Sequence, residues 1–181
     1  MTKPTGSNRL TLGQTGSLER MPVFALLDNI RSAWNIGSMF RTADAVALNG
    51  LYLSGMCATP PRPDIEKPAL GATEMVPWSY SKDPFEIVTS LKEAEIKIVA
   101  LEQVDNAKQY DEFEYPFPCC FVVGNEVDGV SAEVAKHADY AVEIPMNGAK
   151  QSLNVAVSFG VMAFEIRRQW NARQRRLITP E

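Results

Sequence analysis

Short, predominantly apolar runs alternate along this chain with longer segments in which apolar residues recur at helical spacing. The runs occupy residues 23–27, 51–54, 97–101, 119–123 and 140–144. A short apolar run bounded by turn residues is typical of a strand that is buried on both faces of a parallel sheet. The alternation therefore predicts an α/β fold, with a mostly parallel sheet flanked by helices.

Turn-forming and capping residues predict the helices. After the first strand, apolar residues at helical spacing indicate a helix that is stopped by Asn49-Gly50. Further helices are expected at residues 83–94 and 131–137, the second capped by Ser131. These helices fall between the apolar runs, as the α/β fold requires.

Two long segments are expected to be mainly irregular. Residues 55–74 contain four prolines and are predicted to form a loop, followed by a short strand at residues 75–80. An acidic and aromatic loop is expected between residues 101 and 118. No internal repeat interrupts this organisation.

The C-terminal third contains the most unusual apolar pattern. The last strand ends at Pro145, a turn follows at Asn147-Gly148, and Ser152 is a good N-cap for a helix over residues 153–166. This helix is apolar on nearly every face, so it must be enclosed on all sides. It is too short and too interrupted by polar residues to cross a bilayer. We therefore expect it to lie between its own sheet and a second subunit, as a homodimer.

Composition adds the expected domain organisation. The 181 residues, 45% of them hydrophobic and 22% charged, suit one domain over residues 21–170, with a flexible arm at 1–20 and a basic tail at 171–181. The N-terminus lacks the pattern of a signal peptide, which favours a cytoplasmic protein without a membrane segment. Three cysteines, with no spacing typical of metal ligands, are expected in the core, and no metal is expected.

Charge is distributed unevenly along the chain. The net charge is −4, but residues 83–143 hold 4 basic and 14 acidic side chains, which leaves both terminal segments positive. If those segments meet in the fold, they can present a surface for phosphates. The alternative is a solvated charged surface without a partner.

Three polar clusters follow apolar strands, at the positions where open α/β sheets bind ligands. The first cluster holds Asn35, Gly37, Arg41, Thr42 and Ala43; the second spans residues 124–129; the third holds Pro145, Met146, Gly148, Ser152, Leu153, Asn154 and Val155. We therefore expect a ligand site where the three clusters meet.

Each cluster also has a structural explanation when it is considered alone. Arg41 can form a salt bridge with Glu126 instead of binding a phosphate. Glu126 can cap a helix, Ser152 can be an N-cap, and Asn154 can form a first-turn hydrogen bond. His137 lies outside the clusters and is expected to be structural or at the surface.

Together, the order and spacing of the clusters resemble the SpoU or TrmH-type branch of the SPOUT RNA methyltransferases. The likeness extends from about residue 23 to residue 170 and includes the segment Ala69-Leu70-Gly71-Ala72. It implies transfer of a methyl group from S-adenosylmethionine to a ribose 2′-hydroxyl of RNA. It also implies a homodimer, and a C-terminal deep trefoil knot that nothing in the periodicity indicates.

The resemblance also implies the site residues. The cofactor would contact Val123, Gly124, Asn125, Ile144, Pro145, Met146, Leu153 and Asn154, and the catalytic group would comprise Asn35, Arg41, Glu126, Ser152 and Asn154. A guanidinium is almost always protonated, so Arg41 is better suited to hold an RNA phosphate than to act as a base. The segment after the first strand lacks the G-x-G-x-x-G turn of dinucleotide enzymes.

RNA contacts are expected from basic residues at both ends of the chain. Besides Arg41, the candidates are Arg9, Arg20, Arg173, Arg175 and Arg176, and the C-terminal arginines are expected to leave the cofactor end of the fold. A tRNA substrate is preferred over rRNA. The alternative is a module of the same fold that binds RNA or cofactor without turnover.

Overall fold

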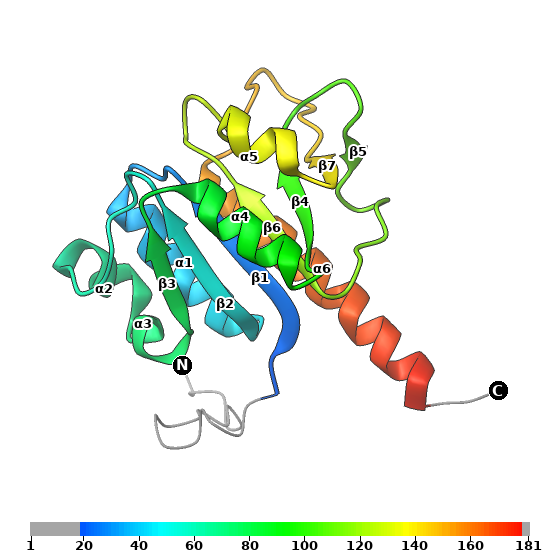
Figure 1. Cartoon of the computed structure of the whole chain (residues 1–181), viewed down its shortest axis with the longest axis horizontal. Coiled ribbons are helices and arrows are strands. Elements are labelled where there is room, and N and C mark those ends of the chain that lie inside the picture. The colour runs from blue at the N-terminus through cyan, green and yellow to red at the C-terminus, as the bar shows by residue number, and fades with distance from the viewer. Residues whose placement is uncertain (1–18, 179–181) are drawn as a thin grey trace, which may run out of the picture.

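The computed structural model of the protein describes residues 19–178, and its centre is one sheet covered by helices on both faces (Figure 1). The strands are β1 (Met21–Asp28), β2 (Leu48–Ser54), β3 (Trp78–Ser81), β4 (Lys97–Leu101), β5 (Lys108–Gln109), β6 (Cys119–Val123) and β7 (Tyr140–Glu143). The helices are α1 (Ala33–Ala45), α2 (Pro63–Ala69), α3 (Ala72–Met75), α4 (Pro84–Glu93), α5 (Ala132–His137) and α6 (Val155–Ile178).

The seven strands of this sheet all pair in parallel, in the order β3-β2-β1-β6-β4-β7-β5. Strand β1 pairs with the central strand β6 so that Val23 lies opposite Cys119 and Leu27 opposite Val123. The predicted α/β fold with a parallel sheet is therefore confirmed. The trefoil knot implied by the resemblance stays a prediction.

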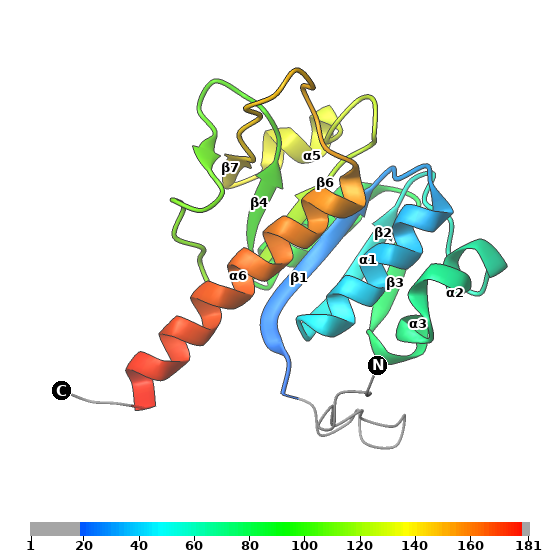
Figure 2. The same cartoon turned by 180° about the vertical axis from the view of Figure 1, so that it is seen from behind.

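Alternate residues of the central strands point to opposite faces of the sheet. In β6, Phe121 packs toward α1 and α6, whereas Cys120 and Val122 pack toward α4 and α5. Figure 2 shows α1 and α6 side by side on the first face, and Figure 1 shows α4 and α5 on the second. Because both faces are covered, the central strands need continuous apolar runs, which is the pattern that predicted them.

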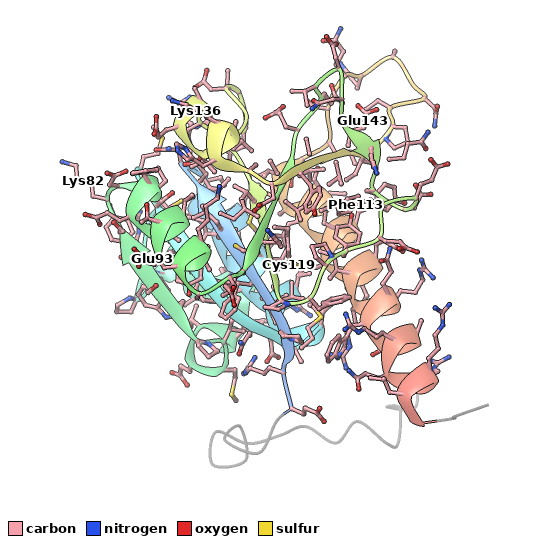
Figure 3. All side chains as sticks on the ribbon, turned by 45° about the vertical axis from the view of Figure 1, so that its right-hand side comes forward. Lys82, Glu93, Phe113, Cys119, Lys136 and Glu143 are labelled. Carbon is pink, nitrogen blue, oxygen red and sulfur yellow. The ribbon has the colours of Figure 1, made fainter. Side chains whose placement is uncertain are left out.

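The three cysteines lie in the core, as predicted. Cys57, Cys119 and Cys120 are buried and unpaired, and Cys119 sits inside the molecule in Figure 3. Burial raises the pKa of the Cys119 thiol to about 12, and that of the Cys57 thiol to about 11. Both thiols therefore stay protonated at neutral pH and pack as small apolar groups.

The prediction that Asn49-Gly50 stops the first helix is wrong. The helix ends at Ala45, and Ala47, with a φ of 51°, makes the left-handed turn. Asn49 and Gly50 belong to β2, where Gly50 lies opposite Phe24 and a β-carbon would approach the Pro77 carbonyl oxygen to 3.1 Å. Here glycine permits a close approach between backbones instead of a turn.

The expected loop over residues 55–74 contains two helices, α2 and α3. Pro63 occupies the start of α2, where a residue without an N–H leaves no helical hydrogen bond unmade. The four prolines therefore did not exclude a helix, and the prediction was wrong. The strand expected at residues 75–80 is observed as β3 at Trp78–Ser81, and the two-residue β5 lies in the other expected loop.

The last helix differs from its prediction at both ends. Ser152 is not its N-cap, because the side-chain oxygen of Asn154 accepts from the backbone N–H groups of Ala156 and Val157 at 2.9 and 3.4 Å. The helix continues without interruption to Ile178, so the residues expected as a basic tail include its last two turns. Within residues 19–178 no helix has the combination of length and apolar character needed to cross a membrane.

One face of α6 is buried against the sheet and the opposite face is open. Phe159, Met162 and Ile166 are fully buried, whereas Val157 and Phe164 are 52% and 58% exposed. A single chain therefore does not enclose this helix on all sides. Enclosure of the open face by a second copy stays a prediction.

Ser131 occupies the N-cap position of α5, but its side chain makes no capping hydrogen bond. Its backbone N–H instead donates to the buried carboxylate of Asp28 at 2.7 Å. This contact joins the end of β1 to the start of α5. The predicted helix is present, but its predicted cap is not.

Candidate functional site

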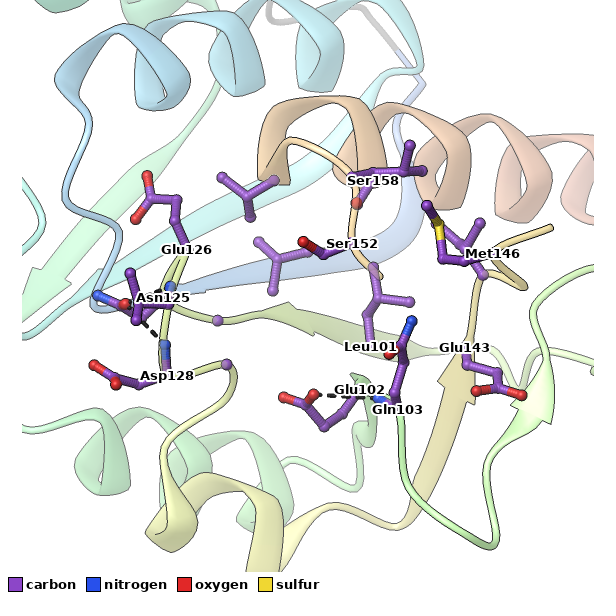
Figure 4. Close-up of a pocket in the computed structure, with 17 residues that line it drawn as sticks. Leu101, Glu102, Gln103, Asn125, Glu126, Asp128, Glu143, Met146, Ser152 and Ser158 are labelled. Atoms are coloured by element: carbon purple, nitrogen blue, oxygen red, sulfur yellow. Dashed lines mark hydrogen bonds between the residues drawn. The ribbon is translucent and has the colours of Figure 1, made fainter. Parts of the chain in front are cut away.

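A cavity of about 270 Å³ opens at the carboxyl ends of β4, β6 and β7, beside the start of α6 (Figure 4). Its lining residues are Leu101, Glu102, Gln103, Val123, Gly124, Asn125, Glu126, Val127, Asp128, Gly129, Glu143, Ile144, Met146, Ser152, Leu153, Val155 and Ser158. This edge of the sheet is where parallel α/β folds bind ligands. The cavity is therefore the candidate site.

Six of the eight residues expected to contact a cofactor line this cavity: Val123, Gly124, Asn125, Ile144, Met146 and Leu153. Pro145 and Asn154 do not line it. Pro145 is exposed, and the Asn154 side chain caps α6. The second and third polar clusters thus surround one cavity.

The loop that follows β6 is held in a tight conformation by its own residues. A β-carbon at Gly124 would collide with the backbone of Gly129 and Val130. The Asn125 side-chain oxygen accepts from Val127 and Asp128 backbone N–H groups at 2.9 and 3.1 Å. The backbone N–H and C=O of Asn125 also pair with Gly129, at 2.8 and 3.0 Å, so Asn125 fixes the shape of this cavity wall.

A chain of hydrogen bonds brings the three clusters together at the rim of the cavity. The Asn35 amide donates to Oε1 of Glu126 at 3.0 Å, and the Asn154 amide donates to Oδ1 of Asn35 at 3.3 Å. The Glu126 carboxylate also accepts from the backbone N–H groups of Arg31 and Ser32, at 3.1 and 3.3 Å. The loop after β6, the start of α1 and the start of α6 are therefore linked.

The donors around Glu126 favour its ionised form. Burial acts against the charge, but hydrogen bonds from the Arg31 backbone, the Glu126 backbone, the Asn35 side chain and the Ser32 backbone outweigh it, so the pKa of Glu126 lies below its ordinary value. The Glu126 carboxylate is therefore charged at neutral pH and can accept the hydrogen bonds from Arg31, Ser32 and Asn35.

We expect Glu126→Gln to lower the free energy of unfolding at neutral pH by about 1 kcal/mol, because an amide replaces one of two accepting oxygens with a donor. A lowered folded-state pKa gives stability that is present above the ordinary pKa of 4.5 and is lost as the pH falls through the lowered value. The difference between wild type and variant in urea unfolding should therefore shrink below pH 4.5.

Glu93→Gln, at an exposed position of α4, is the control and should leave the stability unchanged. A Glu126→Gln variant that is equally stable at neutral pH would show that the carboxylate does not anchor α1.

Arg41 lies apart from this network. It is exposed on α1, six residues after Asn35, and does not line the cavity. In the described part of the chain it has no carboxylate partner, so the alternative of a salt bridge with Glu126 is not realised. Its guanidinium is therefore available to an external anion.

The charged residues that line the cavity are all acidic. They are Glu102, Glu126, Asp128 and Glu143, and no lysine, arginine or histidine is among the lining residues. A phosphate group would meet carboxylates and no cation here, whereas a cationic ligand with an apolar body would be attracted. This charge argues against a nucleoside phosphate as the ligand and favours a positively charged one.

A further wall of the cavity, formed by Leu101, Glu102 and Gln103, was not predicted from the sequence. The Glu102 carboxylate accepts from the Val130 backbone N–H at 2.8 Å, and the Gln103 amide donates to the Gln151 carbonyl at 3.0 Å. These residues follow the predicted strand 97–101 directly. The rule that located the other clusters, polar residues at a strand's carboxyl end, would have located this wall as well.

The residues expected to contact RNA are dispersed. Arg9 lies outside the described residues. The Arg20 guanidinium donates to the Leu48 and Met75 carbonyls at 2.8 and 2.6 Å, so it stabilises the fold and is not retained as an RNA contact. Arg173 is 18 residues beyond Val155 on one helix, about 27 Å from the cavity end. The expectation that the C-terminal arginines leave the cofactor end of the fold is therefore wrong.

The C-terminal arginines instead lie near the acidic loop. Arg173 stacks on the Phe117 ring at 5.7 Å, and Arg173 and Arg176 share a groove with Asp111, Glu112 and Glu114. Figure 3 shows Phe113 of the same loop beside α6.

Nowhere in residues 19–178 do three or more histidine, cysteine or acidic residues form a group that could hold a metal ion.

Comparison with known families matches residues 22–164 to the SpoU rRNA Methylase family, a range that includes all three polar clusters. The chain is similar to the 23S rRNA (guanosine-2'-O-)-methyltransferase RlmB of Neisseria meningitidis, with 33% identity over 158 residues. That match covers 84% of this chain and 61% of the relative, so the chain spans about three fifths of that relative's length.

Two further similarities agree with this match. The tRNA (guanosine(18)-2'-O)-methyltransferase of Aquifex aeolicus is 35% identical over 148 residues, which cover 81% of this chain and 68% of the relative. The solved structure of AviRb from Streptomyces viridochromogenes, a SpoU methyltransferase in complex with the cofactor AdoMet, has a TM-score of 0.78 at 28% identity. It covers 85% of this chain and 63% of that chain.

Proposed function

Because this chain belongs to the SpoU rRNA Methylase family, we propose that it transfers a methyl group from S-adenosylmethionine to a ribose 2′-hydroxyl of RNA. The observation that carries the proposal is the hydrogen-bonded chain Glu126–Asn35–Asn154, which joins the three motifs at the rim of an acidic cavity. The relatives are named for particular rRNA and tRNA substrates. For this chain we propose only that the substrate is RNA.

The cavity suits S-adenosylmethionine in both shape and charge. Val123, Ile144, Met146 and Leu153 give it apolar walls for an adenine ring, while backbone groups of the same loops can satisfy the ring nitrogens. The bound cofactor would supply an electrophilic methyl group on a positively charged sulfur. The acidic lining contains no cation and therefore suits that positive charge. Binding of S-adenosylmethionine also needs no phosphate-binding loop.

Arg41 is proposed to act on the RNA. Its exposed guanidinium would bind the phosphate next to the target ribose through two parallel hydrogen bonds. The bound arginine would orient the hydroxyl and stabilise the charge that develops on its oxygen as the proton passes to a phosphate or to water. Asn35, held by Glu126, fixes the start of the helix that carries Arg41.

A tRNA substrate is our preference, and rRNA is the nearest competitor. Incubation with methyl-labelled S-adenosylmethionine and separate tRNA and rRNA fractions should label the tRNA fraction. Labelling of rRNA alone would reverse the preference and leave the proposed reaction intact. Binding of S-adenosylmethionine and RNA without any transfer would favour the alternative of a non-catalytic module.

The open face of α6 supports a homodimer as the working form. Val157 and Phe164 are seven residues apart, so both project outward from the same side of the helix. A second copy that packs α6, with α1 beside it, against the same elements would remove this apolar stripe from water. The packing would provide the enclosure that the apolar pattern of α6 requires.

We expect Phe164→Glu to convert the dimer to a monomer at micromolar concentration, because a charge would be buried in the apolar interface. Sedimentation velocity measures the result. Val104→Glu, at another exposed apolar residue in the loop after β4, is the control and should stay dimeric. A wild-type protein that sediments as a monomer at this concentration would refute the dimer.

A further inference from the structure

The indole of Trp34 lies at the surface, directly beside the polar network of the site. Trp34 is 52% exposed in the first turn of α1, and the next residue, Asn35, contacts Glu126 and Asn154. Large aromatic side chains are normally well buried, because they remove much apolar surface from water. A half-exposed tryptophan beside a candidate site is therefore a candidate contact for a ligand.

Close packing between α1 and α2 determines the surroundings of Trp34. Gly37 allows this packing, because a β-carbon there would collide with the Ile65 carbonyl oxygen and the Pro68 ring. With the two helices in contact, Lys67 of α2 places its ammonium group 5.5 Å from the centre of the indole. The cation–π contact orients the ring from one side. The exposed remainder of the ring is open to a stacking partner.

Trp34 and Arg41 lie on the same outward stripe of α1. Residues seven apart on a helix point in the same direction and are separated by about 10 Å along its axis. Both side chains are exposed, and Ser38 between them donates its hydroxyl to the Trp34 carbonyl at 3.0 Å. A single RNA strand that runs along this stripe can therefore contact both side chains.

Lys67 at the indole, and the exposed arginines before and along α1, are not neutralised. In the described part of the chain, Arg31, Lys67 and Arg41 pair with no carboxylate, whereas Arg62 is paired with Asp64 at 3.0 Å. An exposed aromatic ring on a surface with unpaired cations is the combination with which proteins bind single-stranded nucleic acid. The same patch on a second copy would be repelled by this charge, so we expect α1 to meet a second copy beside the stripe with Trp34 and Arg41 and not on it.

We propose that Trp34 is a stacking platform for an unpaired base of the RNA substrate, near the nucleotide whose phosphate Arg41 holds. The proposal rests on the proposed function, and it specifies the substrate class. A base inside a continuous A-form duplex cannot stack on a protein ring, so the substrate presents its target in a loop, bulge or single strand. Lys67 and Arg31 contact the neighbouring phosphates.

Trp34→Ala should raise KM for the RNA that the wild type methylates roughly 5- to 100-fold, the loss for one stacked base. S-adenosylmethionine affinity should not change. Trp34→Phe should recover most of the RNA affinity, because a phenyl ring still stacks. Tyr140→Ala, at an aromatic residue of β7 that is 42% exposed, is the matched control and should behave as wild type.

Fluorescence tests the stacking without turnover. A short oligoadenylate should quench the emission of the wild type more than that of Trp34→Phe, which retains Trp78 and Trp170. Equal quenching in both proteins, an unchanged KM in Trp34→Ala, or dissociation of the dimer in Trp34→Ala would each overturn the proposal. A wild type that methylates no RNA would refute the proposed function, while the quenching experiment would still decide whether Trp34 stacks on bases.

Discussion

Replacing Arg41 with alanine is expected to reduce methyl transfer by on the order of 10²-fold or more while the affinity for S-adenosylmethionine stays nearly constant. The side chain does not line the cavity, so cofactor binding should not depend on it. Its proposed contacts are with the RNA phosphate and with charge that develops on the ribose oxygen. Loss of such a contact affects the transition state far more than the bound ground state.

Two further variants make this expectation specific. Arg41→Lys should recover little activity, because lysine keeps the charge but loses the two-pronged geometry. Arg62→Ala is the control, since Arg62 is also exposed but is paired with Asp64 at 3.0 Å. Single-turnover rates with saturating cofactor measure the effect. Near-normal turnover in Arg41→Ala would remove Arg41 from the proposed mechanism.

Changing Arg173, Arg175 and Arg176 together to glutamine is expected to weaken RNA binding by on the order of 10²-fold at about 0.1 M salt. Three lost phosphate contacts would also flatten the salt dependence of the binding constant by about three phosphate-equivalents. S-adenosylmethionine affinity should not change, because these arginines lie about 27 to 32 Å from the cavity end of α6. RNA would therefore extend along the helix, away from the site of chemistry.

The alternative for these arginines is a structural role. Arg173 already stacks on Phe117, and the groove it shares with Asp111 and Glu114 offers acidic neighbours. An unchanged salt slope in the triple variant would favour this alternative. The control changes Lys82, Lys92 and Lys136 to glutamine, which removes the same charge from the region of α4 and α5. Figure 3 shows Lys82 and Lys136 there. If both triple variants lose equal affinity, net charge and not the helix end governs binding.

The strands of the central sheet were predictable because burial on both faces leaves an unambiguous signal in the sequence. Residues 97–101 and 119–123 coincide with β4 and β6. Local turn signals were less informative. Asn49-Gly50 has a strong turn composition, yet the pairing of β1 with β2 places it inside a strand. Tertiary pairing overrode local propensity at this position.

The site was predictable in its members but not in its connections. The motifs identified Asn35, Glu126 and Asn154, but only the fold shows that the three form one hydrogen-bonded chain. Ser152 was expected to cap α6, and Asn154 does so instead, because either side chain suits an N-cap and the sequence does not fix where the first turn begins. The surroundings of Trp34 depend on the packing of α2 against α1. Because of its prolines, the segment that forms α2 was expected to be a loop.

Identification of the methylated atom is the decisive test of the proposed ribose 2′-O-methyl transfer. The measurement is mass spectrometry of nucleosides from RNA that has been incubated with the protein and with S-adenosylmethionine carrying an isotopically labelled methyl group. We expect label on the ribose 2′-oxygen of a tRNA or rRNA nucleoside, and loss of that label with Arg41→Ala. Label on a base, or no label in RNA under conditions where the protein binds S-adenosylmethionine, would contradict the proposed transfer.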